Sequence, residues 1–250
     1  ATASYAFNHT NITGNQNYEL EVTQGTTTIV KKFTAVVSPT VVSETIPAGL
    51  VDGINYNPND ATKATLVLDA PLKDFVYVAG SFNNWQPTAA YAMKKDASAG
   101  STKFWLELTG LTAGTNYAYQ YWVVDQTPLA GSPSLVKAAD PYSTLVLSPY
   151  DDGGIPATSF PNLPAYPSGQ EREVTWFKTG QTPYAWSQAT LNFVKPAKEK
   201  LVVYEVLVRD FDARRNFQDL IDKIDYFKNL KVNAIQLMPI MEFEGNESWG

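Results

Sequence analysis

Hydrophobic and polar residues alternate near the start of the chain, as they do in a strand with one buried face. Residues 18–22 read Tyr-Glu-Leu-Glu-Val, and further apolar residues recur at 29–30 and 33–37. Gln24-Gly25 between them indicates a turn, so the pattern predicts a hairpin. Two or three strands are too few to be stable alone. We expect 1–48 to be either the end of a preceding β-domain or strands added to the next one.

The same kind of pattern continues through 49–150, where short apolar strands recur with Gly, Pro and Asn between them. No helical periodicity competes in this stretch. We therefore predict an immunoglobulin-like β-sandwich over 49–150. Its clearest strands are expected at 64–68, 75–79, 103–108 and 117–124.

The pattern breaks down over 151–195, which opens with Asp-Asp-Gly-Gly and then carries prolines at 156, 161, 164 and 167. Such a segment has little regular structure and commonly joins domains. Its aromatic residues, among them Trp176 and Trp186, indicate that it packs against other parts of the protein. We expect a Pro/Gly-rich linker.

A different pattern begins at about residue 196. The near-continuous apolar run 201–208 is typical of a strand of a parallel sheet buried on both faces. Apolar residues from Phe217 to Leu230 then lie on one helical face, with Asn216 placed to cap it. A second apolar run at 232–238 completes a strand–helix–strand unit. One such unit cannot bury both faces of its strands, so we expect 196–250 to be an incomplete domain.

The amino-acid composition excludes several kinds of catalytic and metal-binding site. The 250 residues include no cysteine and one histidine, His9, which excludes thiolate zinc sites, cysteine nucleophiles and multi-histidine metal sites within the chain. We expect no metal and no cofactor. The net charge of −6 argues against nucleic acid as a partner, and no apolar run approaches the length of a membrane span. The lack of cysteine is compatible with an extracytoplasmic as well as a cytoplasmic location of the protein.

Several carboxylates invite a catalytic interpretation. Glu242, Glu244 and Glu247 follow the second apolar strand, where ligand sites of parallel α/β folds lie. A solvated acidic loop is the interpretation that we favour for them, and the same two alternatives hold for Asp210 and Asp212. Glu205, inside a strand, needs a partner, and we favour a structural ion pair such as one with Arg209.

A second cluster suggests sugar binding. The segment 80–85 reads Gly-Ser-Phe-Asn-Asn-Trp, so Trp85 follows a turn rich in Asn and Gly. An indole can serve as a flat platform for a sugar ring, and Asn83, Asn84 and Gln120 would bond its hydroxyls. The alternative is that these aromatic residues belong to the core.

These residues carry a family resemblance. The segments 75–85 and 119–125, together with Ala-Asp-Pro-Tyr at 139–142, resemble a family 48 carbohydrate-binding module. The segments 202–211, 217–230 and 233–250 resemble the first strand, first helix and second strand of glycoside hydrolase family 13. The resemblance covers about 49–250 and extends to multi-domain amylase-like proteins of Bacteroidetes-type bacteria.

The resemblance implies a sandwich that precedes a (β/α)8 barrel. The family's catalytic aspartates and glutamate follow the fourth, fifth and seventh strands, so none falls within this chain and we assign no catalytic residue. Trp85 matches a stacking tryptophan of sugar-binding members. Gln120 stands where those members often have lysine, and the second stacking tryptophan, expected at 126–132, is absent.

We therefore expect a mainly β chain that forms the N-terminal portion of an α-glucan-active glycoside hydrolase and is inactive alone. Its partners would be α-glucan or maltooligosaccharide and the rest of the catalytic barrel, and its location extracytoplasmic in a bacterium. A stand-alone glucan-binding module and a scaffold without sugar affinity are the alternatives. Apolar strand edges after residue 196 predict self-association or local disorder.

Overall fold

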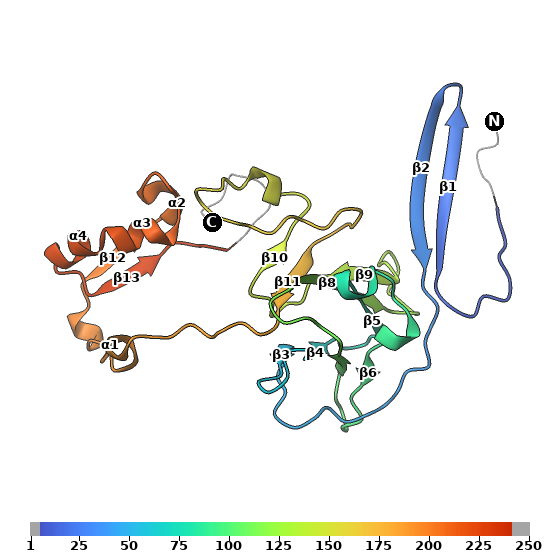
Figure 1. Cartoon of the computed structure of the whole chain (residues 1–250), viewed down its shortest axis with the longest axis horizontal. Coiled ribbons are helices and arrows are strands. Elements are labelled where there is room, and N and C mark those ends of the chain that lie inside the picture. The colour runs from blue at the N-terminus through green and yellow to red at the C-terminus, as the bar shows by residue number, and fades with distance from the viewer. Residues whose placement is uncertain (1–5, 242–250) are drawn as a thin grey trace. The chain divides into compact units, whose positions relative to one another are not determined.

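The computed structural model describes residues 6–241. The chain divides into two compact units, and each is considered by itself (Figure 1). The first contains the residues up to Leu147 together with Gly169–Gln181. The second contains Ser148–Ser168 and the residues from Thr182 onward.

The first unit is a sandwich of two antiparallel sheets, which confirms the predicted mainly β, immunoglobulin-like class at a coarse level. One sheet has four strands in the order β3-β4-β7-β6. The other has the order β10-β11-β8-β5, with β9 also paired to β8. The four-stranded sheet consists of β3 (Gly53–Tyr56), β4 (Ala64–Asp69), β6 (Lys94–Lys95) and β7 (Lys103–Leu108). The five-stranded sheet consists of β5 (Phe75–Gly80), β8 (Asn116–Val124), β9 (Leu135–Ala138), β10 (Val146–Leu147) and β11 (Val174–Lys178).

The core lies between the two sheets. Leu66 and Phe104 of the four-stranded sheet meet Val78, Tyr119 and Tyr121 of the other, all fully buried. The outward side of the five-stranded sheet carries a second apolar cluster. Because side chains alternate along a strand, β8 contributes to both clusters: its odd-numbered residues from 117 to 123 to the core, and Trp122 and Val124 to the outer cluster.

A buried carboxylate ties this core together. Tyr119 and Tyr121 both donate from their hydroxyls to Asp140 Oδ2, at 2.7 and 2.8 Å. The Asp140 main-chain N–H donates to the Thr175 hydroxyl oxygen at 2.6 Å. Burial raises the pKa of both tyrosines well above 10.0, so both remain protonated donors at neutral pH.

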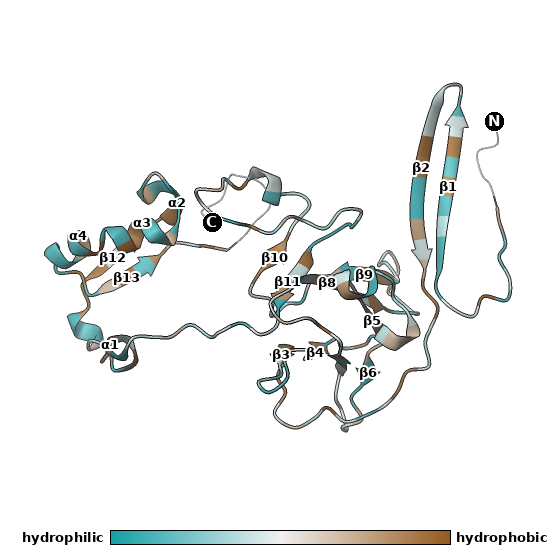
Figure 2. Ribbon diagram, in the orientation of Figure 1, coloured by the Kyte–Doolittle hydropathy of each residue, from teal (hydrophilic) through white to brown (hydrophobic). Residues whose placement is uncertain are grey.

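A predicted hairpin precedes the sandwich. β1 (Gln16–Gln24) and β2 (Thr27–Ala35) pair antiparallel around the turn at Gly25, as the alternation predicts. Tyr18 and Phe33 face each other across the pair and their rings stack. The apolar side chains Leu20, Val22 and Ile29 on the same face are exposed. Figure 2 shows the hydrophobic positions of β1 and β2 as brown bands between hydrophilic ones.

The segment 151–195 contains regular structure that its composition does not predict. β11 lies within it and pairs with both β8 and β10. Its sequence, Val-Thr-Trp-Phe-Lys, has the β-branched and aromatic residues of a strand, and Phe177 enters the core. The segment also contains α1 (Gln188–Leu191) and a 3₁₀ turn at Asp152–Gly154. Elsewhere in the chain, further 3₁₀ turns occur at Ser81–Asn83, Ala89–Tyr91 and Lys198–Lys200.

The second unit contains a parallel strand pair with helices between its strands. β12 (Val203–Val206) pairs parallel with β13 (Ala234–Leu237), as a strand–helix–strand unit requires. The predicted single helix over 217–230 is instead two, α3 (Phe217–Asp222) and α4 (Ile224–Asn229), which meet at Lys223. A shorter helix, α2 (Val208–Phe211), follows β12.

The strands of this pair are not buried on both faces among the described residues. Phe227 of α4 packs on Tyr204, with ring centroids 5.1 Å apart, and covers one side. Val202, Val203 and Leu237 remain 39–52% exposed. The described residues therefore cover only part of this strand pair and leave apolar side chains of both strands exposed.

Candidate glucan-binding site

Trp85 lies in the turn that follows β5. Its main-chain N–H donates to the Gly80 carbonyl at 2.9 Å, which closes the turn. Only glycine fits at position 80, because the Cβ atom of any other residue would lie 2.7 Å from the Ala118 carbonyl oxygen. Asn84 and Trp85 both adopt left-handed backbone conformations, with φ of 52° and 58°. A bulky residue rarely tolerates such a φ, and strain of this kind concentrates at functional sites.

Asn83 holds the turn in place. Its Oδ1 accepts from the Gly80 N–H at 2.8 Å, and its Nδ2 donates to the Val78 carbonyl at 3.0 Å. The carboxamide therefore bonds main chain at both ends and offsets the strain at Trp85. Asn84 is exposed beside it. The structure thus brings three of the four predicted site residues together in one turn.

The indole of Trp85 is half-buried on the outer apolar cluster of the five-stranded sheet. Val36 and Val41, from the segment after β2, pack on the same cluster. One part of the ring system is therefore fixed against protein, and the remainder stays accessible to solvent.

Gln120 lies on the same outward side, paired with Ala79 of β5, but it is only 1% exposed. Its Nε2 donates to the carbonyls of Glu171 and Glu173, at 2.6 and 3.0 Å. Its Oε1 has no hydrogen-bond partner among the described residues. The sequence assigns Gln120 to the sugar, whereas in the structure its amide nitrogen anchors the segment before β11.

Lys137 completes this outward surface. Its ammonium lies 4.2 Å from the ring centroid of Trp122 and 2.6 Å from Glu171 Oε1. The hydrogen bond from Lys137 is the main reason that the Glu171 carboxyl has a lowered pKa. Trp122 is consequently covered and does not offer a second stacking surface.

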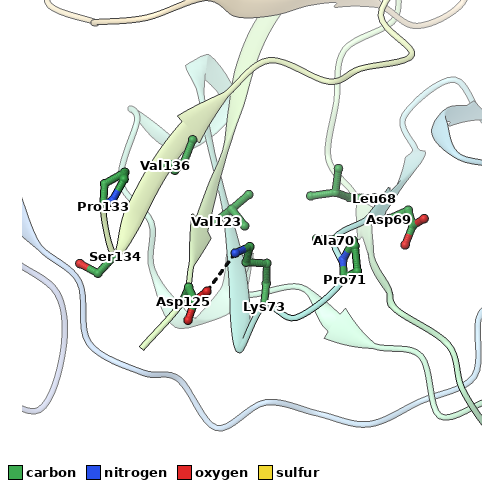
Figure 3. A pocket seen from close by; sticks show the side chains of 10 residues that line it. All are labelled: Leu68, Asp69, Ala70, Pro71, Lys73, Val123, Asp125, Pro133, Ser134 and Val136. Atoms are coloured by element: carbon green, nitrogen blue, oxygen red, sulfur yellow. Dashed lines mark hydrogen bonds and ion pairs between the residues drawn. The ribbon is translucent and has the colours of Figure 1, made fainter. Parts of the chain in front are cut away.

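Two hollows indent the first unit. One, of about 330 Å³, opens between the two sheets and is walled mainly by aliphatic residues, with the Lys73–Asp125 ion pair at its rim (Figure 3). It contains no aromatic platform. The other, of about 480 Å³, is lined by the residues after Trp85 and by segments on both sides of the hairpin. Its lining residues Asn15, Asn17 and Thr88 carry no recognisable motif, so sequence patterns alone do not reveal them.

The predicted carboxylates do not form a catalytic group among the described residues. Glu205 accepts a hydrogen bond from Gln236 Nε2 at 3.1 Å, and Asp212 pairs with Lys223 at 3.4 Å. Asp210 contacts Arg209 at 3.3 Å. Glu242, Glu244 and Glu247 lie outside the described residues.

Residues 6–241 meet neither the requirements of a metal site nor those of a membrane-spanning helix. That part of the chain holds no cluster of three or more His, Cys, Asp or Glu side chains suited to a metal ion. None of its helices combines the length and the apolar character needed to span a bilayer.

Comparisons with known proteins relate part of the chain to enzymes. No family model matches it. It is 42% identical over 59 residues to the malto-oligosyltrehalose trehalohydrolase of Saccharolobus solfataricus, covering 24% of this chain and 10% of that enzyme. It is 36% identical over 80 residues to the Deinococcus radiodurans enzyme of the same name, covering 32% and 12%. It is 45% identical over 51 residues to alpha-amylase 3 of Dictyoglomus thermophilum, covering 18% and 10%.

Among solved structures, the chain resembles GBS pullulanase SAP, crystallised with maltotetraose. The TM-score is 0.51 at 21% identity, covering 78% of this chain and 24% of the pullulanase, which shows a similarity of fold. The chain spans about a tenth of the length of the curated relatives it matches. Over part of its length, the chain is therefore related to glycoside hydrolases of the α-amylase family.

Proposed function

We propose that the first unit is an accessory α-glucan-binding module of the family 48 type. The observation that carries this proposal is Trp85, held at φ 58° by a hydrogen-bonded turn and half-buried on a rigid sheet. A fixed aromatic surface beside a free amide, Asn84, suits the apolar face and the hydroxyls of a glucose ring. Asn83 and Gln120 act in this proposal as positioning residues, because their amide nitrogens bond main chain.

The names of the relatives support the choice of substrate class. The trehalohydrolases act on malto-oligosyltrehalose by name, and the pullulanase of similar fold was crystallised with maltotetraose. Malto-oligosyltrehalose and maltotetraose are both α-glucan oligosaccharides or derivatives of them. Maltooligosaccharides are thus the first ligands to test.

For the second unit, we propose the opening of an α-amylase-type barrel. The parallel pairing of β12 with β13 through intervening helices is the repeating unit of such barrels. The exposed apolar side chains of β12 and β13 would then be covered by further barrel strands. In this arrangement the whole enzyme carries out glycoside hydrolysis, while the described residues bind glucan and support the barrel.

Sedimentation with insoluble starch tests the proposal. The 250-residue chain should sediment with granular starch and should be released by soluble maltoheptaose, whereas Trp85→Ala should remain in the supernatant. Trp186→Ala removes another exposed tryptophan and serves as the matched control. Failure of the wild-type chain to sediment would contradict the proposal.

A scaffold without sugar affinity is the second candidate. It is favoured by one observation, the packing of Val36 and Val41 against the outer cluster beside Trp85. In that case the indole would serve mainly to fix the segment after β2, and Trp85→Ala would lower stability without changing any sugar affinity.

A further inference from the structure

The hollow of about 480 Å³ beside Trp85 has the size of a small-ligand site, for which about 300–1,000 Å³ is usual. Three segments far apart in the sequence form its walls: 13–17 before and within β1, 37–40 after β2, and 86–89 directly after Trp85. Tyr77 of β5 also lines it. Its phenol hydroxyl donates to the Val37 carbonyl at 3.0 Å and joins the sheet to one wall.

Side-chain hydrogen bonds between the walls keep the hollow open. Asn15 Oδ1 accepts from the Val37 N–H at 2.6 Å, and Asn15 Nδ2 donates to the Pro87 carbonyl. Asn17 Nδ2 donates to Gln86 Oε1 at 3.0 Å. Each of the three wall segments is thus bonded to another. A site preformed in this way loses little conformational entropy when a ligand enters.

The residues that line the hollow indicate which class of ligand it would bind. None of the described residues that line the hollow carries a charge, which disfavours phosphates, carboxylates and cations as ligands. Thr13, Thr40 and Thr88 line it, are exposed and carry hydroxyl groups, and the Thr88 side chain makes no capping bond to the helical turn it precedes. Hydroxyl and amide groups with apolar prolines between them fit a neutral polyhydroxyl compound.

The hollow is continuous with the Trp85 turn. Gln86, the next residue, lines it, and Val36 and Val41, which pack with Trp85 on the outer cluster, flank the wall segment 37–40. The hollow thus begins at the residue that follows Trp85 and is bounded by the segment that packs with it, which places a neutral surface next to the Trp85 turn.

We propose that this hollow is a second glucan subsite, which binds glucose units beyond the one stacked on Trp85. The segments on both sides of the hairpin supply part of it, so residues before the sandwich take part in binding. This inference rests on the proposed glucan-binding function. It predicts that affinity rises with chain length, because a longer chain occupies both subsites.

Calorimetric titration of the 250-residue chain with glucose and with maltoheptaose tests the subsite. The double variant Thr40→Val/Thr88→Val removes two hydroxyl groups while preserving side-chain shape. It should weaken maltoheptaose binding about tenfold, as expected for two lost hydrogen bonds, and leave glucose binding unchanged. Ser38→Phe, which fills the hollow, should act in the same direction. Thr127→Val, on an exposed loop outside both hollows, is the matched control.

The possible results distinguish failure of the subsite from failure of the glucan-binding function on which it rests. Wild-type affinity for maltoheptaose in both the double variant and Ser38→Phe would overturn the subsite while glucan binding stands. Equal weakening of glucose and maltoheptaose binding would also overturn it, because the changes would then act through Trp85. A wild-type chain that binds neither sugar would overturn the glucan-binding function itself and the subsite with it.

Discussion

Gln120 donates a hydrogen bond to the carbonyl of Glu171 at 2.6 Å, although 51 residues separate the two along the chain. Through it, β8 holds the segment that leads into β11, and so joins the sandwich to a part of the chain that lies beyond the first 147 residues. At this position the resembled family often has lysine. The amide here serves the protein's own main chain.

Replacing Gln120 by alanine should therefore destabilise the first unit. Two carbonyls lose their donor and a cavity replaces the side chain, so the free energy of unfolding should fall by about 1–3 kcal/mol. Urea unfolding monitored by circular dichroism measures this. Gln126→Ala, on an exposed loop, is the control. An unchanged unfolding midpoint in Gln120→Ala would show that the contact to Glu171 contributes little.

The two tyrosines that bond Asp140 should make the folded protein less stable at alkaline pH. Burial raises the pKa of Tyr119 and Tyr121 in the folded protein above the usual 10.0. Folding therefore favours the protonated phenols, and their contribution to stability is complete below about pH 10 and declines as the pH rises beyond it. The free energy of unfolding, measured in denaturant between pH 8 and 11, should decrease above pH 10.

The double variant Tyr119→Phe/Tyr121→Phe checks the cause of this decline. It should be less stable at pH 8, because Asp140 loses two donors, yet its stability should depend less steeply on pH above 10. An equally steep alkaline decline in the variant would place the responsible groups elsewhere.

The two units should differ in local stability. Among the described residues of the second unit, only Val206 and Phe227 are buried and apolar, whereas β5 and β8 of the sandwich are buried along most of their length. Few buried contacts allow local opening at low free energy. Amide hydrogen exchange should accordingly be faster in β12 and β13 than in β5 and β8. Comparable protection in all four strands would show that further contacts cover β12 and β13.

Four of the nine sandwich strands could be predicted from sequence because their information is local. The expected strands at 64–68, 75–79, 103–108 and 117–124 correspond to β4, β5, β7 and β8 within one residue at each end. Alternating apolar residues bounded by Gly, Pro and Asn were sufficient for that. The hairpin followed from the same signal.

Features that depend on distant segments could not be predicted. β11 is five residues long in a Pro/Gly-rich stretch, and only its pairing with β8 and β10 makes it a strand. The interruption of the expected helix at Lys223 has no Gly or Pro to signal it. At the candidate site, Trp85, Asn83 and Asn84 could be grouped from one motif. The hollow beside them required segments that lie about 70 residues away along the chain, as the 69-residue separation of Asn17 and Gln86 shows.

Tryptophan fluorescence during titration with maltoheptaose tests the central claim most directly. We predict a saturable change for the wild-type chain at millimolar sugar or below, which is absent in Trp85→Ala and retained in Trp186→Ala. No change for the wild-type chain at millimolar sugar, or an unchanged titration curve in Trp85→Ala, would contradict glucan binding at Trp85.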